Sequence, residues 1–434
     1  ALLSKLLVDR GIALDMPRDL PRTEATKVSA SDAEGQMKVD QRRFYGHQRF
    51  VHHPTHGGIC VPVELAKHFD NFVLHVIRCT VAQTSTNDMA KVEERQLSTE
   101  EFVVKVKDLP AFKQLKEKVD DIAKNASWFE KYAWDNAHFL SGCVFYAAGL
   151  AFLASSDFGR LLVGGFLVGL GHSIVTAKII HLSAHGAMGE SELYNKFLSW
   201  FSGDFVGLFP AEAGFDIHIR EHHPHTNIIG LGDSSTWRMP MLPGPVYLFL
   251  APVLFPAVTP LVGASLLVKK PLKLLAFLVS AGLGLYTFVA IMVHWCGYTP
   301  LGGLVTLMLC RSLFSFSYIH INIFQHIGLP MWSQSSRPAR LFQMASGVLN
   351  LHSNPLLDLA FGHSLISCHV EHHLFPRLSD SMCLRVKPAV RNFLLANNLP
   401  YNEDYYYNRL KIFMVDYEKL MVNAPPIWHY VGLQ

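Results

Sequence analysis

Clustered histidines are the feature of this sequence that is most suited to chemistry. The chain has 23 histidines in 434 residues, and most of them fall in short clusters. Imidazoles three or four positions apart share one face of a helix, so a cluster can direct its ring nitrogens to one point. The candidate metal ligands occur in the patterns HxxxH, HxxxHH, HxxHH and NxxxH: His181 and His185; His218, His222 and His223; His369, His372 and His373; and Asn322 with His326.

The number of these imidazoles argues for more than one metal ion. A structural zinc site is filled by four ligands, whereas nine histidines suit two ions, each with five or six positions and room for dioxygen or water. Imidazole accepts iron, zinc, copper or nickel, so the spacing alone does not select the metal. The seven cysteines form no CxxC pair, which disfavours a cysteine zinc site or a disulfide framework.

Acidic residues beside the clusters are candidates to orient the imidazoles. A metal-bound histidine commonly donates its second ring nitrogen to a carboxylate or a carbonyl. Taken singly, each acidic residue is more often a solvated or helix-capping group. The candidates are Asp216, Glu221, Asp233 and Glu371, with His225, His320, His352 and His363 as further partners.

The composition indicates an integral membrane protein. Half of the residues are apolar and only 17% are charged, whereas soluble domains usually carry about 25% charged residues. This shortfall argues against a disordered chain, a coiled coil and an ordinary cytosolic enzyme. The formal net charge of +3 gives no indication of nucleic acid binding.

Four apolar stretches are candidate membrane spans, which need about 20 residues each. They cover residues 139–155, 161–180, 274–294 and 301–321. The connection within each pair is short, so the sequence predicts a mainly α fold with two transmembrane hairpins. A fifth apolar run, 246–268, contains Pro252, Pro256 and Pro260. Because prolines free backbone carbonyls inside a helix, we interpret this run as a re-entrant or interfacial segment rather than a kinked fifth span.

Charge and composition divide the chain into three expected regions. Basic residues cluster before the first and third spans, so the positive-inside rule predicts that these segments and the histidine clusters face the cytosol. We expect a poorly defined amino-terminal segment over residues 1–88 and a cytosolic helical region over 89–136, whose helix follows a capping box at 98–101. The membrane domain is expected over 137–434.

The three histidine clusters, spaced between two hydrophobic hairpins, resemble the histidine boxes of the membrane fatty acid desaturases. The NxxxH element resembles the asparagine and histidine that acyl-CoA desaturases carry on their last span. The resemblance implies that the nine histidines bind two iron ions and that Asn322 contacts metal directly or through water. It further implies an enzyme of lipid metabolism and fatty acid biosynthesis in the endoplasmic reticulum. Such an enzyme takes electrons from external cytochrome b5 and its reductase, and acts with dioxygen on an acyl-CoA or acyl-lipid.

The third cluster also resembles that of one subgroup of the family. Residues 369–377, HVEHHLFPR, are similar to the third box of front-end desaturases. Those proteins usually have glutamine at the position of His369 and usually carry a fused cytochrome b5 domain, and this sequence departs from both features. The resemblance therefore predicts insertion of a double bond without fixing its position, the chain length or the headgroup.

Other functions are compatible with the same residues. A di-iron lipid hydroxylase would use the same site, because no residue decides whether the carbon radical loses a second hydrogen or recaptures oxygen. A non-catalytic membrane regulator would bind metal without turnover. A metal transporter ranks last, since it would place its ligands near the bilayer midplane, whereas these lie at helix ends.

Overall fold

The structure, a computed structural model, describes residues 38–45, 48–53, 57–62, 112–228, 244–330, 332 and 338–420. The elements up to the second histidine cluster are α4 (Phe112–Lys124), η3 (Phe129–Ala133), α5 (Trp134–Leu153), α6 (Phe158–Ser173), η4 (Ile174–Lys178), α7 (Ile179–Ala184), α8 (Glu192–Trp200), η5 (Phe201–Gly207), α9 (Ala211–Phe215), η6 (Asp216–His222) and α10 (His223–His225). The later helices are α11 (Gly244–Leu266), α12 (Pro271–His294), α13 (Pro300–Phe324), α14 (Arg340–Gly347), α15 (Pro355–Phe361), α16 (His369–Leu374), α17 (Asp380–Ala396) and α18 (Tyr406–Leu420). The elements labelled η are π-helical turns that continue a neighbouring α-helix.

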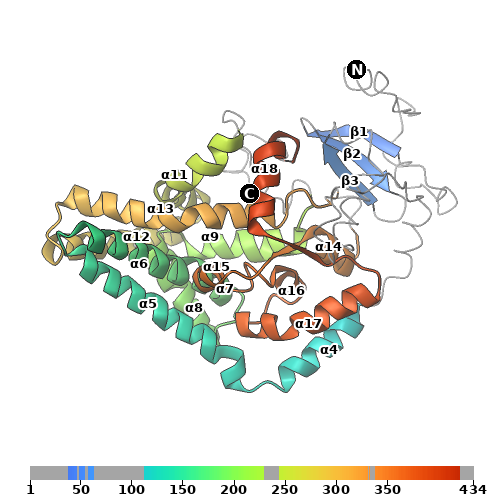
Figure 1. The fold of residues 1–434 in the computed structure, drawn as a ribbon, viewed down its shortest axis with the longest axis horizontal. Coiled ribbons are helices and arrows are strands. Elements are labelled where there is room, and N and C mark those ends of the chain that lie inside the picture. Colours follow the sequence, from blue (N-terminus) through green and yellow to red (C-terminus); the bar gives the residue numbers. More distant parts are fainter. Residues whose placement is uncertain are drawn as a thin grey trace.

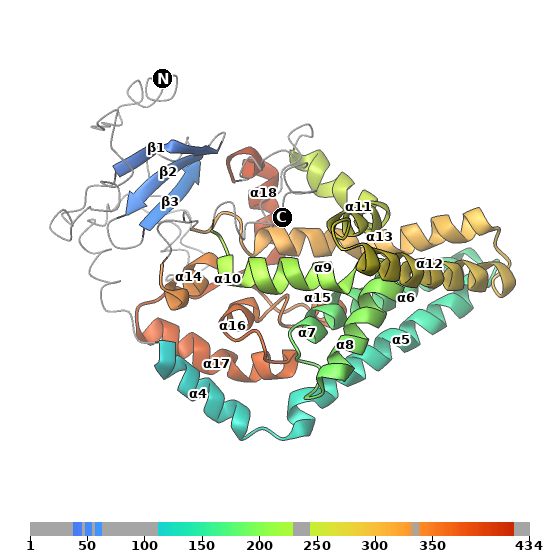
Figure 2. The ribbon, with the colours of Figure 1, turned by 180° about the vertical axis from the view of Figure 1, so that it is seen from behind.

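Two helical hairpins form the membrane half of the molecule, as predicted. Among the described residues, five helices are long and apolar enough to cross a membrane: Phe129–Leu153, Phe158–Ala184, Leu248–Leu266, Pro271–His294 and Pro300–Phe324. Four of them match the predicted spans, and α5, α6, α12 and α13 run side by side at one end of the molecule (Figures 1 and 2). Close contact of α5 with α6 depends on glycine, because a Cβ on Gly171 would lie 2.5 Å from the carbonyl oxygen of Gly142.

Helix α11 is the fifth apolar helix, and it stays continuous through its three prolines. Pro252 cannot donate to the carbonyl of Leu248, and His320 of α13 donates to that oxygen at 2.9 Å instead. The Leu248 end of α11 therefore lies near the carboxyl end of α13, which leads to His326. Beyond the other end of α11, Lys270 contacts Asp216, two residues before His218. Both ends of α11 thus lie on the histidine side of the bundle, which supports a re-entrant or interfacial path.

A second layer of shorter helices covers the histidine end of the bundle. Leu115 and Val119 of α4 are buried and share one hydrophobic core with Val386 and Val390 of α17. Helices α14 and α16 lie between this pair and the bundle (Figure 2). The predicted helix before the membrane is therefore present from Phe112 onward, whereas its expected capping box at 98–101 lies outside the described residues.

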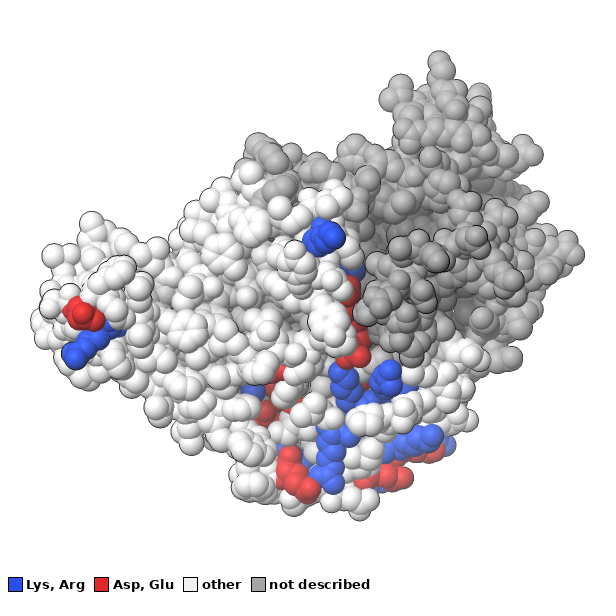
Figure 3. Space-filling view, in the orientation of Figure 1, with Lys and Arg blue, Asp and Glu red and all other residues white. Residues whose placement is uncertain are grey.

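The two halves differ in surface charge on the face drawn in Figure 3. Charged side chains gather over the part of the molecule that carries α4 and α17, while the bundle is white apart from one small charged group at its tip. This segregation is the surface expected of a protein whose hairpins lie in lipid and whose short helices lie in water. The chain is accordingly a mainly α integral membrane protein with its histidine-rich part outside the apolar bundle.

Strands contribute little to the part that carries the histidines. Strands β4 (Leu349–Leu351) and β5 (Asn402–Asp404) pair in parallel. Within the predicted amino-terminal segment, β1 (Lys38–Tyr45), β2 (Gln48–His53) and β3 (Gly57–Pro62) form an antiparallel sheet in the order β1-β2-β3. The sequence predicts only a poorly defined segment there, so this sheet is a feature that the sequence does not reveal.

Candidate metal centre

The structure brings together all nine histidines that the sequence singled out, in two groups. Within each group, one nitrogen from every ring lies within 4.8 Å of the others. The five-histidine group contains His181, His185, His218, His223 and His372, and the four-histidine group contains His222, His326, His369 and His373. Eight of these rings are buried and His218 is partly exposed.

Four separate parts of the chain supply the rings. The first cluster lies at the end of the long α6–η4–α7 helix, and the second lies in the continuous α9–η6–α10 helix. His326 follows the carboxyl end of α13, and the third cluster forms the short helix α16. The hairpins therefore deliver two of the elements, and the α9–η6–α10 helix and α16 deliver the other two, so the site forms only when all four parts pack together.

The π-helical turn η6 explains how the second cluster serves both groups. Residues five apart on an α-helix differ in direction by about 140°, so His218 and His223 would face apart. In a π-helix the backbone hydrogen bonds join residues five apart, so His218 and His223 lie on the same side of η6. Their Nε2 atoms are 3.2 Å apart in the five-histidine group. His222 points to the other group. The third cluster is divided in the same way: His369 and His373 belong to the four-histidine group, and His372 belongs to the five-histidine group.

Hydrogen bonds to the outer ring nitrogens fix the protonation pattern of the four-histidine group. Nδ1 of His369 donates to the carbonyl of Ser364 at 2.9 Å, and Nδ1 of His326 donates to the carbonyl of Gly347 at 3.4 Å. The Thr226 hydroxyl donates to the carbonyl of His222, so it accepts from Nδ1 of His373 at 3.1 Å. A neutral imidazole has one N–H, so all three rings turn an unprotonated Nε2 inward.

These inward nitrogens lie too close together to be stable without a cation. Nε2 of His369 is 2.9 Å from Nε2 of His326 and 3.2 Å from Nε2 of His373. No hydrogen is left to bridge them, so their lone pairs repel. Nitrogens about 2.1 Å from a shared metal would be separated by about 3.0 Å in octahedral and about 3.4 Å in tetrahedral geometry. The donor set therefore fits a transition-metal ion.

Protonation does not relieve this repulsion. Burial lowers the pKa of His369 to about 3, and burial together with the neighbouring imidazoles holds the pKa values of His326 and His373 well below their usual range. Neutral imidazole is the form that binds metal. The buried rings therefore remain neutral, and the site favours a metal cation over a proton.

The five-histidine group has the same inner spacing and fewer outer contacts. Nε2 of His372 lies 2.9 Å from Nε2 of His181 and 3.0 Å from Nε2 of His223. An outer hydrogen bond to a side chain joins Nδ1 of His181 to Ser364 Oγ at 3.3 Å. Among the described residues, Nδ1 of His223 and Nδ1 of His372 have no hydrogen-bond partner. This group is less firmly held from outside.

The orienting partners differ from those expected from the sequence. Glu371 accepts from Asn350 and Tyr401 rather than from a histidine, and Asp216 pairs with Arg220 and Lys270. Asp233 lies outside the described residues. The actual partners are hydroxyls and carbonyls, chiefly from Thr226 and Ser364. Sequence gave no signal for these residues, because serine and threonine are common and carbonyls belong to every residue.

Two further expectations concern α13. Asn322 lies one turn before His326, and its amide nitrogen donates to the carbonyl of Tyr318 at 2.7 Å. The amide oxygen is therefore the atom available to a metal or to metal-bound water. His320, expected as a supporting histidine, bonds Leu248 and Tyr406 instead.

Comparisons with known proteins place the chain in one family. The family described as Fatty acid desaturase matches residues 159–405, which include all nine histidines. The chain is 45% identical to the human protein named Fatty acid desaturase 6 over 323 residues, which is 74% of this chain and 91% of that protein. The mouse protein of the same name is 44% identical over 324 residues, 74% of this chain and 95% of that protein. The Caenorhabditis elegans Delta(5) fatty acid desaturase fat-4 is 23% identical over 263 residues, 53% of this chain and 57% of that protein.

Proposed function

Because this chain belongs to the fatty acid desaturase family, we propose that it is a di-iron membrane desaturase acting on an acyl-CoA or acyl-lipid. Its metal ligands are the nine grouped histidines, with Asn322 in contact with a metal or its water. The observation that carries the proposal is the convergence of unprotonated Nε2 atoms at 2.9 and 3.2 Å in the four-histidine group. A buried site of this kind needs a cation, and two such groups provide for two.

Two bound irons would supply the oxidising chemistry that side chains cannot. In the overall reaction, dioxygen, two electrons and two protons would remove one hydrogen from each of two adjacent methylenes and give a double bond and two waters. The protein's part is to hold the site rigid and dry. Ser364, Thr226 and the Gly347 carbonyl keep the rings in the tautomer whose Nε2 faces inward. The surrounding helices bury eight of the nine rings, which excludes bulk water from the oxidant.

Electron supply and location follow from the same assignment. Cytochrome b5 and its reductase are the proposed donors, and the endoplasmic reticulum is the proposed membrane. Lys113, Lys116 and Lys124 of α4 are exposed in the layer that covers the histidine end. This charge supports a cytosolic histidine side by the positive-inside rule.

Fatty acid profiling of cells that express the full chain tests the proposal. We expect a new double bond, located by mass spectrometry, that is absent with His185→Ala and present with His352→Ala. His352 is the matched control because it stacks on Tyr405 and lies outside both groups. A hydroxylated acyl chain in place of the alkene would favour the hydroxylase. Protein that contains metal but yields no lipid product would favour the alternative of a non-catalytic membrane regulator.

A further inference from the structure

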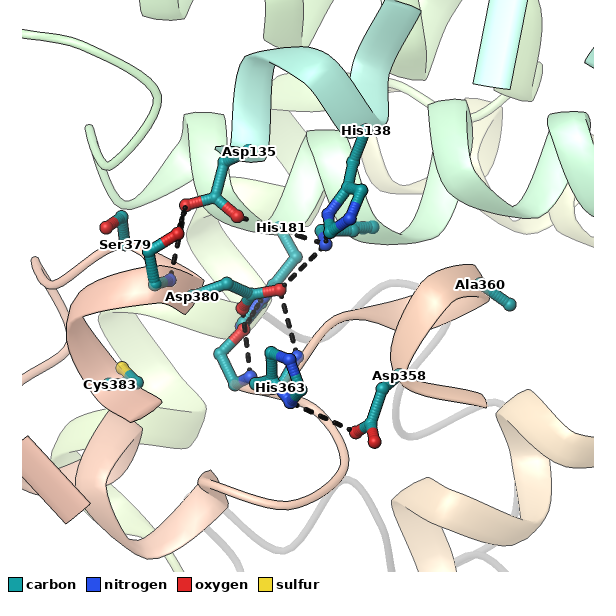
Figure 4. Close-up of polar contacts among 12 residues, drawn as sticks. Asp135, His138, His181, Asp358, Ala360, His363, Ser379, Asp380 and Cys383 are labelled. Atoms are coloured by element: carbon teal, nitrogen blue, oxygen red, sulfur yellow. Dashed lines mark hydrogen bonds and ion pairs between the residues drawn. The ribbon is translucent and has the colours of Figure 1, made fainter. Parts of the chain in front are cut away.

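A buried ion pair lies beside the two histidine groups and belongs to neither. Lys178 and Asp380 have exposed side-chain fractions of 0% and 1%, and their charged atoms are 3.0 Å apart. Figure 4 shows Asp380 at the centre of the polar contacts, with His363 on one side and Asp135 and His138 on the other. Removing two charges from water is costly, so the pair calls for an explanation beyond stability.

Asp380 holds a short loop by its backbone. Its Oδ2 accepts from the amide of His363 and its Oδ1 accepts from the amide of Ser364, both at 2.9 Å. The loop begins at Gly362, whose φ of 91° is a conformation that favours glycine. A Cβ at Gly362 would lie 2.2 Å from Asp380 Oδ2. The carboxylate and the loop therefore fit against each other only because residue 362 has no side chain.

Ser364, which this loop presents, touches one histidine of each group. Its Oγ lies 3.3 Å from Nδ1 of His181, in the five-histidine group. Its carbonyl oxygen accepts from Nδ1 of His369, in the four-histidine group, at 2.9 Å. A displacement of this one residue would turn rings on both sides of the centre.

The charge on Asp380 strengthens its hold on the loop. Burial alone would raise the pKa of this carboxyl, but the Lys178 ammonium and the hydrogen bonds from Ser364 hold that pKa below its usual value. Hydrogen bonds to an ionised acceptor are roughly twice as strong as neutral ones. Lys178 also lies three residues before His181, so the ion pair ties the helix of the first cluster to the same loop.

We propose that Asp380 and Ser364 are positioning residues that set the ring orientations of His181 and His369, so that one loop supports both metal groups. The inference rests on the proposed function, because it takes both groups to hold metal. Asp380 acts through the loop backbone and Ser364 acts directly on the two rings. This arrangement predicts that the two residues affect the groups differently.

Metal release from the purified full chain tests the inference. The experiment follows iron lost to a strong chelator for wild type, Asp380→Asn and Ser364→Ala, with thermal unfolding measured in parallel. Asp380→Asn keeps the side-chain shape but removes the charge and replaces one of the two acceptor oxygens with an NH2 donor. We therefore expect release from both groups to accelerate by about tenfold or more. Ser364→Ala removes Oγ but keeps the carbonyl, so we expect faster release from the five-histidine group alone.

Glu403→Gln is the matched control. Glu403 pairs at 2.7 Å with Lys387, on the same helix that begins with Asp380, and the pair is mostly buried. We expect its release curve to match wild type. If Asp380→Asn does not fold, the rate of iron release from the five-histidine group in Ser364→Ala still tests the positioning role. The positioning role would be overturned if the wild type holds iron and Ser364→Ala, or folded Asp380→Asn, releases it at the wild-type rate. That result would leave the proposed function standing. Wild type without iron would overturn the proposed function itself.

Discussion

The two histidine groups have similar inner geometry and unequal support from the surrounding protein. In the four-histidine group, three rings are anchored through Nδ1 by Ser364, Gly347 and Thr226. In the five-histidine group, Ser364 contacts one ring, and His218 is partly exposed. Since outer hydrogen bonds orient a ligand and raise its affinity for metal, we expect the four-histidine group to hold its ion more tightly.

Neighbouring histidines on α16 allow the groups to be emptied one at a time. His372→Ala removes a proposed ligand of the five-histidine group, and His373→Ala removes a proposed ligand of the four-histidine group. We expect each variant to lose about one of two irons and to lose desaturation by more than about 100-fold, beyond what outer-contact changes cost. Iron content and product yield are the measurements.

The control for these variants is His352→Ala, which should keep iron and activity. Full activity in His372→Ala would contradict the assignment of that histidine as a ligand. Loss of both irons in either variant would show that the groups do not bind independently.

Thr226 contacts a ring of the four-histidine group, and its substitution is expected to have a smaller effect than the loss of a histidine. Thr226→Ala removes the acceptor for Nδ1 of His373, so we expect iron affinity at the four-histidine group to fall by about 10- to 100-fold. Thr226→Ser keeps the hydroxyl and should stay close to wild type. Competition with a chelator gives both affinities, and equal affinities for the alanine and serine variants would rule out this role for the hydroxyl.

Unequal support should also appear in the unmodified protein. During chelation of wild type we expect two phases of iron loss that differ by about tenfold in rate, with the five-histidine group emptying first. The remaining slow phase should persist in His372→Ala and vanish in His373→Ala. A single phase for wild type would mean that the difference in outer contacts has no effect on release.

Asn322 is expected to give the smallest effect. Its amide nitrogen is already bonded to the carbonyl of Tyr318, which leaves the amide oxygen for the proposed contact with metal or water. We expect Asn322→Ala to keep both irons and to lower the rate of desaturation by less than about tenfold, as for an outer contact. Steady-state kinetics and iron content measure this, and loss of an iron would instead make Asn322 a true ligand.

Much of the site could be predicted from sequence because its ligands are a rare residue type at regular spacing. Histidine is uncommon enough that HxxxH, HxxxHH and HxxHH stand out, and all nine predicted ligands lie in the two groups. The spans were predictable because lipid requires long apolar helices. Their ends were extended by only a few residues in most cases, since the apolar signal fades where helices leave the membrane.

The division into two groups was not predictable by helix periodicity. His218 and His223 meet because η6 is π-helical, whereas the spacing of the histidines predicts faces only for an α-helix. The orienting residues were missed for another reason: Ser364 acts through a loop seated on Asp380, and such tertiary contacts leave no local pattern. The prolines of α11 predicted a re-entrant or interfacial segment, but the sequence could not show that His320 donates to the Leu248 carbonyl that Pro252 leaves free.

The most direct test of the two-group account is the metal content of the purified full chain from iron-replete cells, measured by elemental mass spectrometry. The account predicts about two irons per chain, one for each group of histidines. A single zinc ion per chain, or iron-free protein that still inserts a double bond, would contradict it.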